Sequence, residues 1–252
     1  MLAEPPTQPE PSIAMRLESF QTRDWAEENS RLAHADPREI LCWANETFGR
    51  KLTMATAFGP EGCVLLHMIA EINPKLRVFN LDTGYQFAET LAVRDRVRER
   101  YGIDVELVQP DTTVAEYEAD HPIPLYVTNP DRCCHDRKIV PLRRAVLGYD
   151  AWISSIRGDQ TADRARTPVV GWDAKFSLVK VNPLLNWTRR EVWAFIHAHD
   201  VPYNPMFDQG YSSVGCFPCT RPTAEGESER SGRWAGKAKT ECGLHSLDSS
   251  QL

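Results

Sequence analysis

The cysteines are the residues of this chain whose spacing points most directly to chemistry. Cys216 and Cys219 are separated by two residues, one of them proline, which is a common way to present half of a metal or iron–sulfur site. Cys133 and Cys134 are adjacent and would complete the four thiolates that a cluster needs. Adjacent ligands favour a helix or turn at Cys133, and they favour a core larger than one zinc ion. We therefore predict an iron–sulfur cluster; a zinc site and four unliganded cysteines are the alternatives.

The cysteine nearest the end of the chain has the surroundings of a nucleophile. Cys242 stands in the sequence Glu-Cys-Gly-Leu-His at residues 241–245, between Lys239 and His245, whose positive charge would favour the thiolate. Glu241 opposes this effect by repelling the thiolate. Neighbouring glycines would let the segment fold over a crevice and leave it again. We predict a catalytic Cys242; the alternative is an incidental exposed cysteine on a tail.

Charge and composition restrict the class of protein. The chain has 252 residues and a formal net charge of −6, which argues against nucleic acid as a partner. No apolar run approaches the roughly 18 residues of a membrane span, and the first fifteen residues do not resemble a signal peptide. We therefore expect a cytoplasmic protein with neither DNA nor a membrane as partner. In that reducing compartment seven cysteines favour cluster or catalytic roles, while Cys42 and Cys63, each alone in an apolar helix pattern, are expected in the core.

The apolar pattern predicts the α/β fold that must position these cysteines. An apolar run at 52–58 is followed by a turn at 59–62 and then by a helical pattern. The same alternation continues along the chain and predicts a mostly parallel sheet with flanking helices. Because ligands of such sheets bind beyond the carboxyl ends of the strands, the segments after Phe58 and Leu81 should face one crevice. The expected strands lie at 52–58, 77–81, 105–108 and 152–156, and the expected helices include 87–101 and 137–147.

Three segments of different character divide the chain. Residues 1–15 are rich in proline and lack apolar periodicity, so we expect a disordered leader. Residues 16–223 should form one globular domain, in which capping signals mark helix starts at 36–39 and 188–191. Residues 224–252 contain too few apolar side chains for a core element and should form a mobile arm that carries Cys242.

The cysteine pair, the later Cys-x-x-Cys and the terminal Glu-Cys-Gly-Leu-His together resemble the assimilatory adenylyl sulfate (APS) and phosphoadenylyl sulfate (PAPS) reductase family. The resemblance extends from about Leu52 to His245. It includes Leu81-Asp82-Thr83-Gly84, Lys138, Arg157, and the segment from Arg230 to Trp234.

The resemblance implies a fold similar to the adenine-nucleotide alpha-hydrolase group and a 4Fe-4S cluster on the four paired cysteines. It further implies that Cys242 attacks the sulfur of adenylyl sulfate, that AMP leaves, and that thioredoxin or a glutaredoxin-like donor releases sulfite from the S-sulfocysteine. The substrate is a dense anion, so fixed cations must assist the attack. The expected substrate-binding residues are Thr56, Phe58, Gly59, Leu81, Asp82, Thr83, Gly84, Lys138, Arg157, Arg230, Arg233 and His245.

Other functions agree with the same residues. The branch of the family that uses the 3′-phosphorylated nucleotide generally lacks the four ligand cysteines, so reduction of PAPS is the second hypothesis. A third is a zinc-stabilised nucleotide-binding or tRNA-thiolation protein that uses the cysteines structurally. The segment Thr56-Ala57-Phe58-Gly59 contains no Walker lysine, although its backbone amides could still hold a phosphate or ribose. The cluster is expected to tune electrostatics without passing electrons, and association of identical chains into a homo-oligomer is left open.

Overall fold

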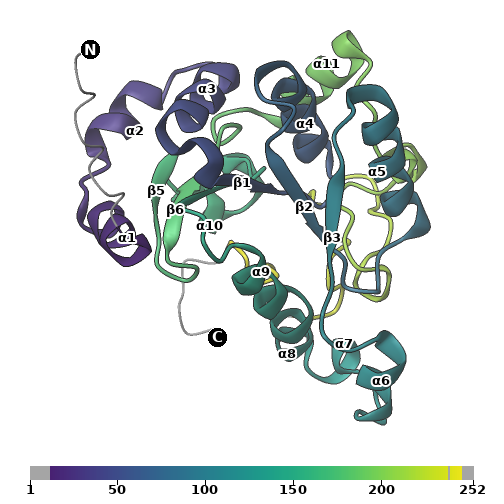
Figure 1. Cartoon of the computed structure of the whole chain (residues 1–252). Coiled ribbons are helices and arrows are strands. Elements are labelled where there is room, and N and C mark those ends of the chain that lie inside the picture. Colours follow the sequence, from purple (N-terminus) through teal and green to yellow (C-terminus); the bar gives the residue numbers. More distant parts are fainter. Residues whose placement is uncertain (1–11, 238, 246–252) are drawn as a thin grey trace, which may run out of the picture.

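One six-stranded sheet organises the part of the chain that the computed structural model describes, which is residues 12–237 and 239–245 (Figure 1). The strands are β1 (Leu52–Ala55), β2 (Arg77–Leu81), β3 (Val105–Val108), β4 (Ala151–Ile153), β5 (Val170–Asp173) and β6 (Leu178–Val181). They lie in the order β3-β2-β1-β4-β6-β5. Every neighbouring pair is parallel except β5 and β6, which form an antiparallel hairpin at one edge. The predicted α/β fold with a mostly parallel sheet is confirmed.

Helices precede, connect and follow these strands. They are α1 (Ile13–Thr22), α2 (Ala26–Leu32), α3 (Pro37–Phe48), α4 (Pro60–Ile72), α5 (Ala88–Tyr101), α6 (Val114–Ala119), α7 (Leu125–Thr128), α8 (Pro130–Cys134), α9 (Val140–Ala145), α10 (Ala162–Ala165) and α11 (Arg189–His199). A π-helical turn at His135–Ile139 joins α8 to α9, and short 3₁₀ turns lie at Gly49–Lys51, Gly158–Gln160, Pro205–Gln209 and Phe217–Cys219. None of the helices among the described residues is long and apolar enough to cross a bilayer.

Apolar side chains cover both faces of the sheet. Alternate residues of a strand point to opposite faces, so Val78 joins the larger core with α3, α4, α5 and α11, while Phe79 joins the smaller core under α9. Trp152 of β4 belongs to the smaller core and is almost fully buried. The sheet is thus a rigid support for whatever lies at its strand ends.

Several predicted elements are confirmed and others need correction. The strands at 77–81 and 105–108 and the capped helix starts at Asp36 and Thr188 are found as predicted. The first strand ends at Ala55 and not at 58, and Phe58 itself adopts a left-handed conformation with φ +54°, which an extended strand cannot include. Helix α4 then begins at Pro60, so most of the turn predicted at 59–62 is the first turn of that helix.

Cys42 is a second correction, because it is exposed and not part of the core. The buried stripe of α3 contains Ile40, Leu41, Ala44 and Phe48, and Cys42 lies outside it. Cys63 is buried, as predicted.

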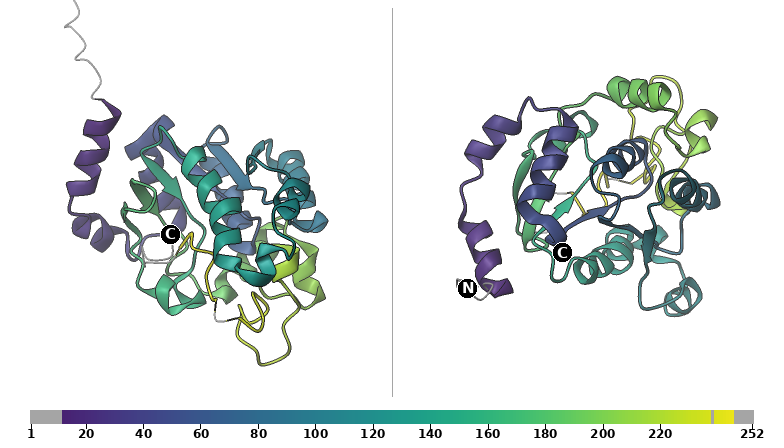
Figure 2. Two further views of the ribbon diagram at one scale, coloured as in Figure 1. Left: turned by 90° about the horizontal axis from the view of Figure 1, so that it is seen from below. Right: turned by 45° about the horizontal axis from the view of Figure 1, so that its top comes forward.

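The two ends of the chain also differ from the predicted segments. Helix α1 begins at Ile13, inside the leader predicted for residues 1–15, and packs beside β6 (Figures 1 and 2). Residues 1–11 lie outside the described part, as do residue 238 and residues 246–252 of the arm. The described arm contains neither helix nor strand, but Trp234 is buried, so the arm packs on the domain more closely than its composition suggested.

Candidate functional site

The strand ends of β1, β2 and β4 meet at one crevice. Strand order reverses between β1 and β4, and ligands of open parallel sheets bind at such a point. A cavity of about 730 Å³, here called the strand-end pocket, opens there. It is lined by Ala55, Thr56, Ala57, Asn80, Leu81, Thr83, Gln86, Thr90, Lys138, Leu142, Trp152, Ser154, Ser155, Val214, Gly215, Cys216, Leu244 and His245.

Side-chain hydrogen bonds hold the loops of this pocket in place. The Thr56 hydroxyl accepts from the Phe58 N–H, and Asn80 donates to the Thr56 carbonyl at 2.8 Å. Asp82 accepts from the Gly84 N–H at 3.0 Å. Arg137 is buried and donates to the Thr83 carbonyl at 2.6 Å, so a cation beneath the loop after β2 fixes its path.

The four paired cysteines surround a small neighbouring cavity, here called the cysteine pocket, together with Lys138, Arg233 and Trp234. Cys133 and Cys134 come from α8, while Cys219 ends the 3₁₀ turn that contains Pro218 and Cys216 directly precedes that turn. Burial raises the pKa of Cys133 to about 12 and that of Cys134 to about 11. Thr83 lies 3.3 Å from the Cys216 sulfur and lines both cavities, so the two are directly connected.

A third cavity, of about 890 Å³, lies between the end of β4 and the arm and is here called the basic pocket. Six lysine or arginine side chains line it, against the two carboxylates of Glu61 and Glu229, so it suits an anion of more than one charge. Cys242 and His245 form part of the same wall. The basic side chains are Lys138, Arg157, Arg164, Arg189, Arg230 and Arg233.

A buried ion pair anchors the end of the arm beside this pocket. Arg164 donates to both carboxylate oxygens of Glu241, at 2.8 and 3.0 Å, and Arg230 donates to Glu241 at 3.3 Å. Burial would raise the pKa of Glu241, but these two arginines lower it. Glu241 repels the Cys242 thiolate, as its sequence position suggested, and its ion pairs also fix the residue before Cys242.

Nearby cations also act on Cys242 itself. Burial would raise the pKa of the Cys242 thiol, and Glu241 adds to this effect. Lys138 and Arg230, together with the Leu244 N–H, outweigh both, so the pKa is lowered. Lys138 lines all three cavities and lies in the π-helical turn directly after the cysteine pair. It is therefore the cation shared by the cysteines and the nucleophile.

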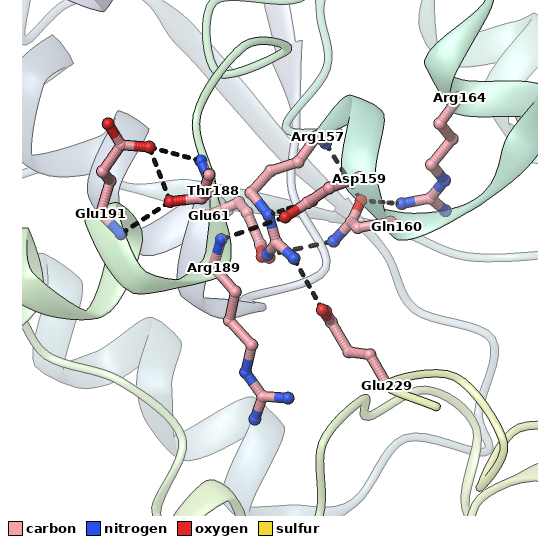
Figure 3. Close-up of polar contacts among 9 residues, drawn as sticks. All are labelled: Glu61, Arg157, Asp159, Gln160, Arg164, Thr188, Arg189, Glu191 and Glu229. Atoms are coloured by element: carbon pink, nitrogen blue, oxygen red, sulfur yellow. Dashed lines mark hydrogen bonds and ion pairs between the residues drawn. The ribbon is translucent and has the colours of Figure 1, made fainter. Parts of the chain in front are cut away.

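Arg157 is the centre of a second network, drawn in Figure 3. Its guanidinium is buried and is paired with Glu61 from the start of α4, with Asp159 at 2.8 Å and with Glu229 of the arm at 2.6 Å. Gln160 connects this group to Arg164. The guanidinium of Arg189 extends away from the group (Figure 3), and Arg189 also lines the basic pocket. Glu229 and Glu241 thus both hold the arm to the domain, and Lys239 adds a further ion pair with Asp131.

The structure brings most of the predicted substrate-binding residues to these cavities. Thr56, Leu81 and Thr83 line the strand-end pocket, and Lys138 and His245 line both larger pockets. The basic pocket receives Gly59, Arg157, Arg230, Arg233 and the predicted nucleophile Cys242. Phe58, Asp82 and Gly84 line none of the three cavities and instead shape the loops, so for them the structure supports a positioning role and not direct contact.

Sequence reasoning missed other residues of the site. Ser154 and Ser155 follow an apolar strand, and their polar character at a strand end was a signal that could have located them. Glu61, Arg164, Lys180 and Glu229 carry no such signal, because each is recognised only through a partner distant in the sequence.

Comparisons with known proteins agree with this arrangement. Residues 51–222 match the phosphoadenosine phosphosulfate reductase domain. The chain belongs to this reductase family. A phosphoadenosine 5′-phosphosulfate reductase of Gloeobacter violaceus is 48% identical over 83% of this chain and 88% of its own. An adenosine 5′-phosphosulfate reductase of Shouchella clausii is 42% identical over 92% of this chain and 97% of its own.

Solved structures support the same assignment to the reductase family. A phosphoadenylyl-sulfate reductase from Candida auris superposes with a TM-score of 0.69 at 31% identity, over 77% of this chain and 95% of its own. An FMN adenylyltransferase of Candida glabrata gives a TM-score of 0.56 at 14% identity, over 90% of this chain and 81% of its own, which shows a shared fold alone. The family and the adenine-nucleotide alpha-hydrolase-like fold expected from the cysteine motifs are confirmed.

Proposed function

We propose that the protein reduces adenylyl sulfate to sulfite and AMP, with thioredoxin as the electron donor. The observation that carries this proposal is the position of Cys242 in the wall of the basic pocket, beside Lys138 and Arg230, which lower its pKa. A thiolate held there can attack a sulfuryl group whose charge the surrounding arginines neutralise. The names of the relatives from Shouchella clausii and Bacillus subtilis support the substrate.

The reaction follows from the chemistry of one sulfur nucleophile. The Cys242 thiolate forms a bond to the sulfur of adenylyl sulfate, the bond from that sulfur to the bridging phosphate oxygen breaks, and AMP leaves. A thioredoxin thiolate then attacks the Cys242 sulfur of the S-sulfocysteine and releases sulfite. The second thioredoxin thiol resolves the mixed disulfide, so that Cys242 is restored and the two electrons come from the dithiol.

The four paired cysteines fit a 4Fe-4S cluster. They surround one cavity and are all free, and cysteine thiolates are the usual ligands of such clusters. Among residues 12–237 and 239–245, no three or more His, Cys, Asp or Glu side chains are grouped as they would be around one metal ion, and the preference for a larger inorganic core over zinc rests on the adjacent Cys133 and Cys134. We propose that Cys133, Cys134, Cys216 and Cys219 hold this cluster, which would supply electrostatic tuning and order at Lys138 and Thr83.

Substitution of Cys242 by serine tests the reaction. Purified without oxygen, the C242S variant should bind nucleotide and retain its iron and acid-labile sulfide, but it should release no sulfite with adenylyl sulfate and thioredoxin. The exposed Cys42 is the matched control, and C42S should keep full activity. Sulfite release by C242S would refute the mechanism, and wild-type protein without iron and sulfide would refute the cluster.

Reduction of the 3′-phosphorylated nucleotide is the second candidate. The Gloeobacter violaceus relative, which shares 48% identity, is named for that substrate. The ratio of kcat/KM for the two nucleotides, measured with the same thioredoxin, distinguishes the candidates. We expect adenylyl sulfate to be preferred.

A further inference from the structure

Lys180 is a buried lysine that neither the family motifs nor the proposed mechanism explains. It lies in β6 and is 8% exposed. Its partner in the register of β4 is Trp152, so the two side chains are neighbours on one face of the sheet, and the Lys180 ammonium lies 5.2 Å from the Trp152 ring centre. A lysine on the inner face of a parallel sheet requires a compensating interaction.

The charge of Asp173 supplies part of this compensation, and Lys180 also contacts His245 of the arm. The Lys180 Nζ lies 3.1 Å from Nδ1 of His245. The imidazole is also stacked on Trp152, with ring centres 6.0 Å apart and planes inclined by 6°. Trp152 therefore packs against both Lys180 and His245. The pairing of β4 with β6 fixes where Lys180 lies, and so which edge of the imidazole it contacts.

The chemistry of the two groups decides which nitrogen carries the proton. An ammonium group can only donate, so Nδ1 must accept, and the proton of a neutral imidazole then resides on Nε2. We propose that Lys180 is a positioning residue that holds His245 as a neutral Nε2–H tautomer, so that His245 donates a hydrogen bond to the substrate and does not act as a base for Cys242. This inference deepens the proposed function and rests on it for the identity of the substrate.

The charges around the pair are consistent with these protonation states. Burial lowers the pKa of Lys180 to about 8, while Asp173 and Glu241 raise it and Arg164 and Lys175 lower it. Lys180 is therefore mostly charged at neutral pH. Burial, Lys180, Arg164, Arg230 and Lys175 all lower the pKa of His245 well below its usual range, so the imidazole is neutral.

His245 lies where an Nε2–H group could donate a hydrogen bond to the substrate. His245 lines the strand-end pocket with Lys138 and Ser154, and it lines the basic pocket with Cys242. With Nδ1 occupied by Lys180, Nε2 is the nitrogen that remains to donate. A neutral donor beside the nucleophile stabilises charge that develops on the departing phosphate oxygen without competing for the proton of Cys242.

Nitrogen-15 NMR of the full chain, labelled at histidine and free of substrate, tests the tautomer directly. The His245 signals are assigned from the spectrum that loses them in H245Q. Wild type should show Nε2–H with an accepting Nδ1, and K180R, which keeps a donor, should show the same. In K180M the imidazole should gain its second proton at a higher pH than in wild type, and K75M, which removes an exposed lysine, should change nothing. An Nδ1–H tautomer in wild type would overturn the inference.

Kinetics with adenylyl sulfate distinguish a positioning role of Lys180 from a merely structural one, because only a positioning role makes the effect of K180M on kcat/KM depend on His245. K180M should lower kcat/KM roughly tenfold. This is less than the roughly 100- to 1000-fold loss in rate that follows removal of an oxyanion donor, because His245 itself remains in place. H245Q carries an amide N–H in place of Nε2–H and has no tautomer to set, so adding K180M to it should cost less than about threefold. Equal losses in the two backgrounds would refute the positioning role. Wild type inactive with adenylyl sulfate would refute the proposed function alone, because the NMR result is independent of activity.

Discussion

Replacement of Arg164 by methionine should release the end of the arm. Arg164 lies in α10, its side chain is 8% exposed, and it donates to both oxygens of Glu241, the residue before Cys242. Methionine fills similar space but leaves the buried Glu241 carboxylate with the contact from Arg230 at 3.3 Å and the hydrogen bond from the Thr161 hydroxyl at 3.2 Å. The perturbation therefore acts on the docking of the arm, and because Arg164 also lines the basic pocket, proteolysis reports the docking more directly than kinetics do.

The magnitude follows from the geometry of the pair. Removing one partner of a buried ion pair costs about 3–5 kcal/mol, because the other charge is left without compensation. Arg230 retains part of that compensation, so we take the lower end, about 3 kcal/mol. At about 1.4 kcal/mol per factor of ten, the equilibrium constant for docking of the arm should fall by a factor of roughly 150.

Limited digestion of the native protein with trypsin measures this equilibrium, since cleavage of a transiently released segment follows its open population. Cleavage after Lys237, in the arm, should be accelerated about 100-fold in R164M, and kcat/KM for adenylyl sulfate should fall at least about tenfold. The matched control is R166M, directly after the same short helix, whose exposed arginine pairs with Asp163. R164M and R166M cut at equal rates would refute the reasoning.

A double variant separates a lost anchor from an uncompensated charge. Adding E241Q to R164M removes the buried carboxylate charge, so the arm should dock better than in R164M alone, although less well than in wild type. Faster cleavage of the double variant than of R164M would show that the unpaired Glu241 is not what displaces the arm.

Three further results are expected. G62A should destabilise the fold by about 1–3 kcal/mol and raise KM, because the new Cβ would lie 2.6 Å from the Thr56 hydroxyl. In the control G59A the nearest atom lies 3.5 Å from the new Cβ, so its thermal unfolding midpoint should stay close to that of wild type. Lys180 has a pKa of about 8 when folded and about 10.4 when unfolded, so the unfolded chain binds more protons between these values. The unfolding free energy of wild type should therefore rise relative to K180M by up to about 3 kcal/mol across that window in denaturant titrations, and a constant difference would contradict the shift. C63A should lower the unfolding midpoint, because Cys63 is fully buried in the larger core and its truncation leaves a small cavity, while sulfite release should be retained. Unchanged stability would contradict this prediction.

Much of the fold and some of the site could be predicted because the signals are local. The strands at 77–81 and 105–108 are short apolar runs bounded by polar turns, and the capping boxes at Asp36 and Thr188 act within four residues. The β5–β6 hairpin was missed because the turn between its strands contains no glycine that would mark it. The length of β1 was wrong because the left-handed Phe58 is imposed by the Thr56 hydroxyl and by packing, which a hydropathy pattern does not register.

The sequence by itself determined the cysteine arrangement, the family and the parallel sheet, because motif spacing and apolar period are properties of neighbouring residues. Only the tertiary structure decided that Glu241 pairs with Arg164, 77 positions away, and that His245 meets Lys180, 65 positions away. The physical reason is that a buried charge is tolerated only where folding supplies its partner, and the identity of that partner depends on how the sheet and the arm pack together.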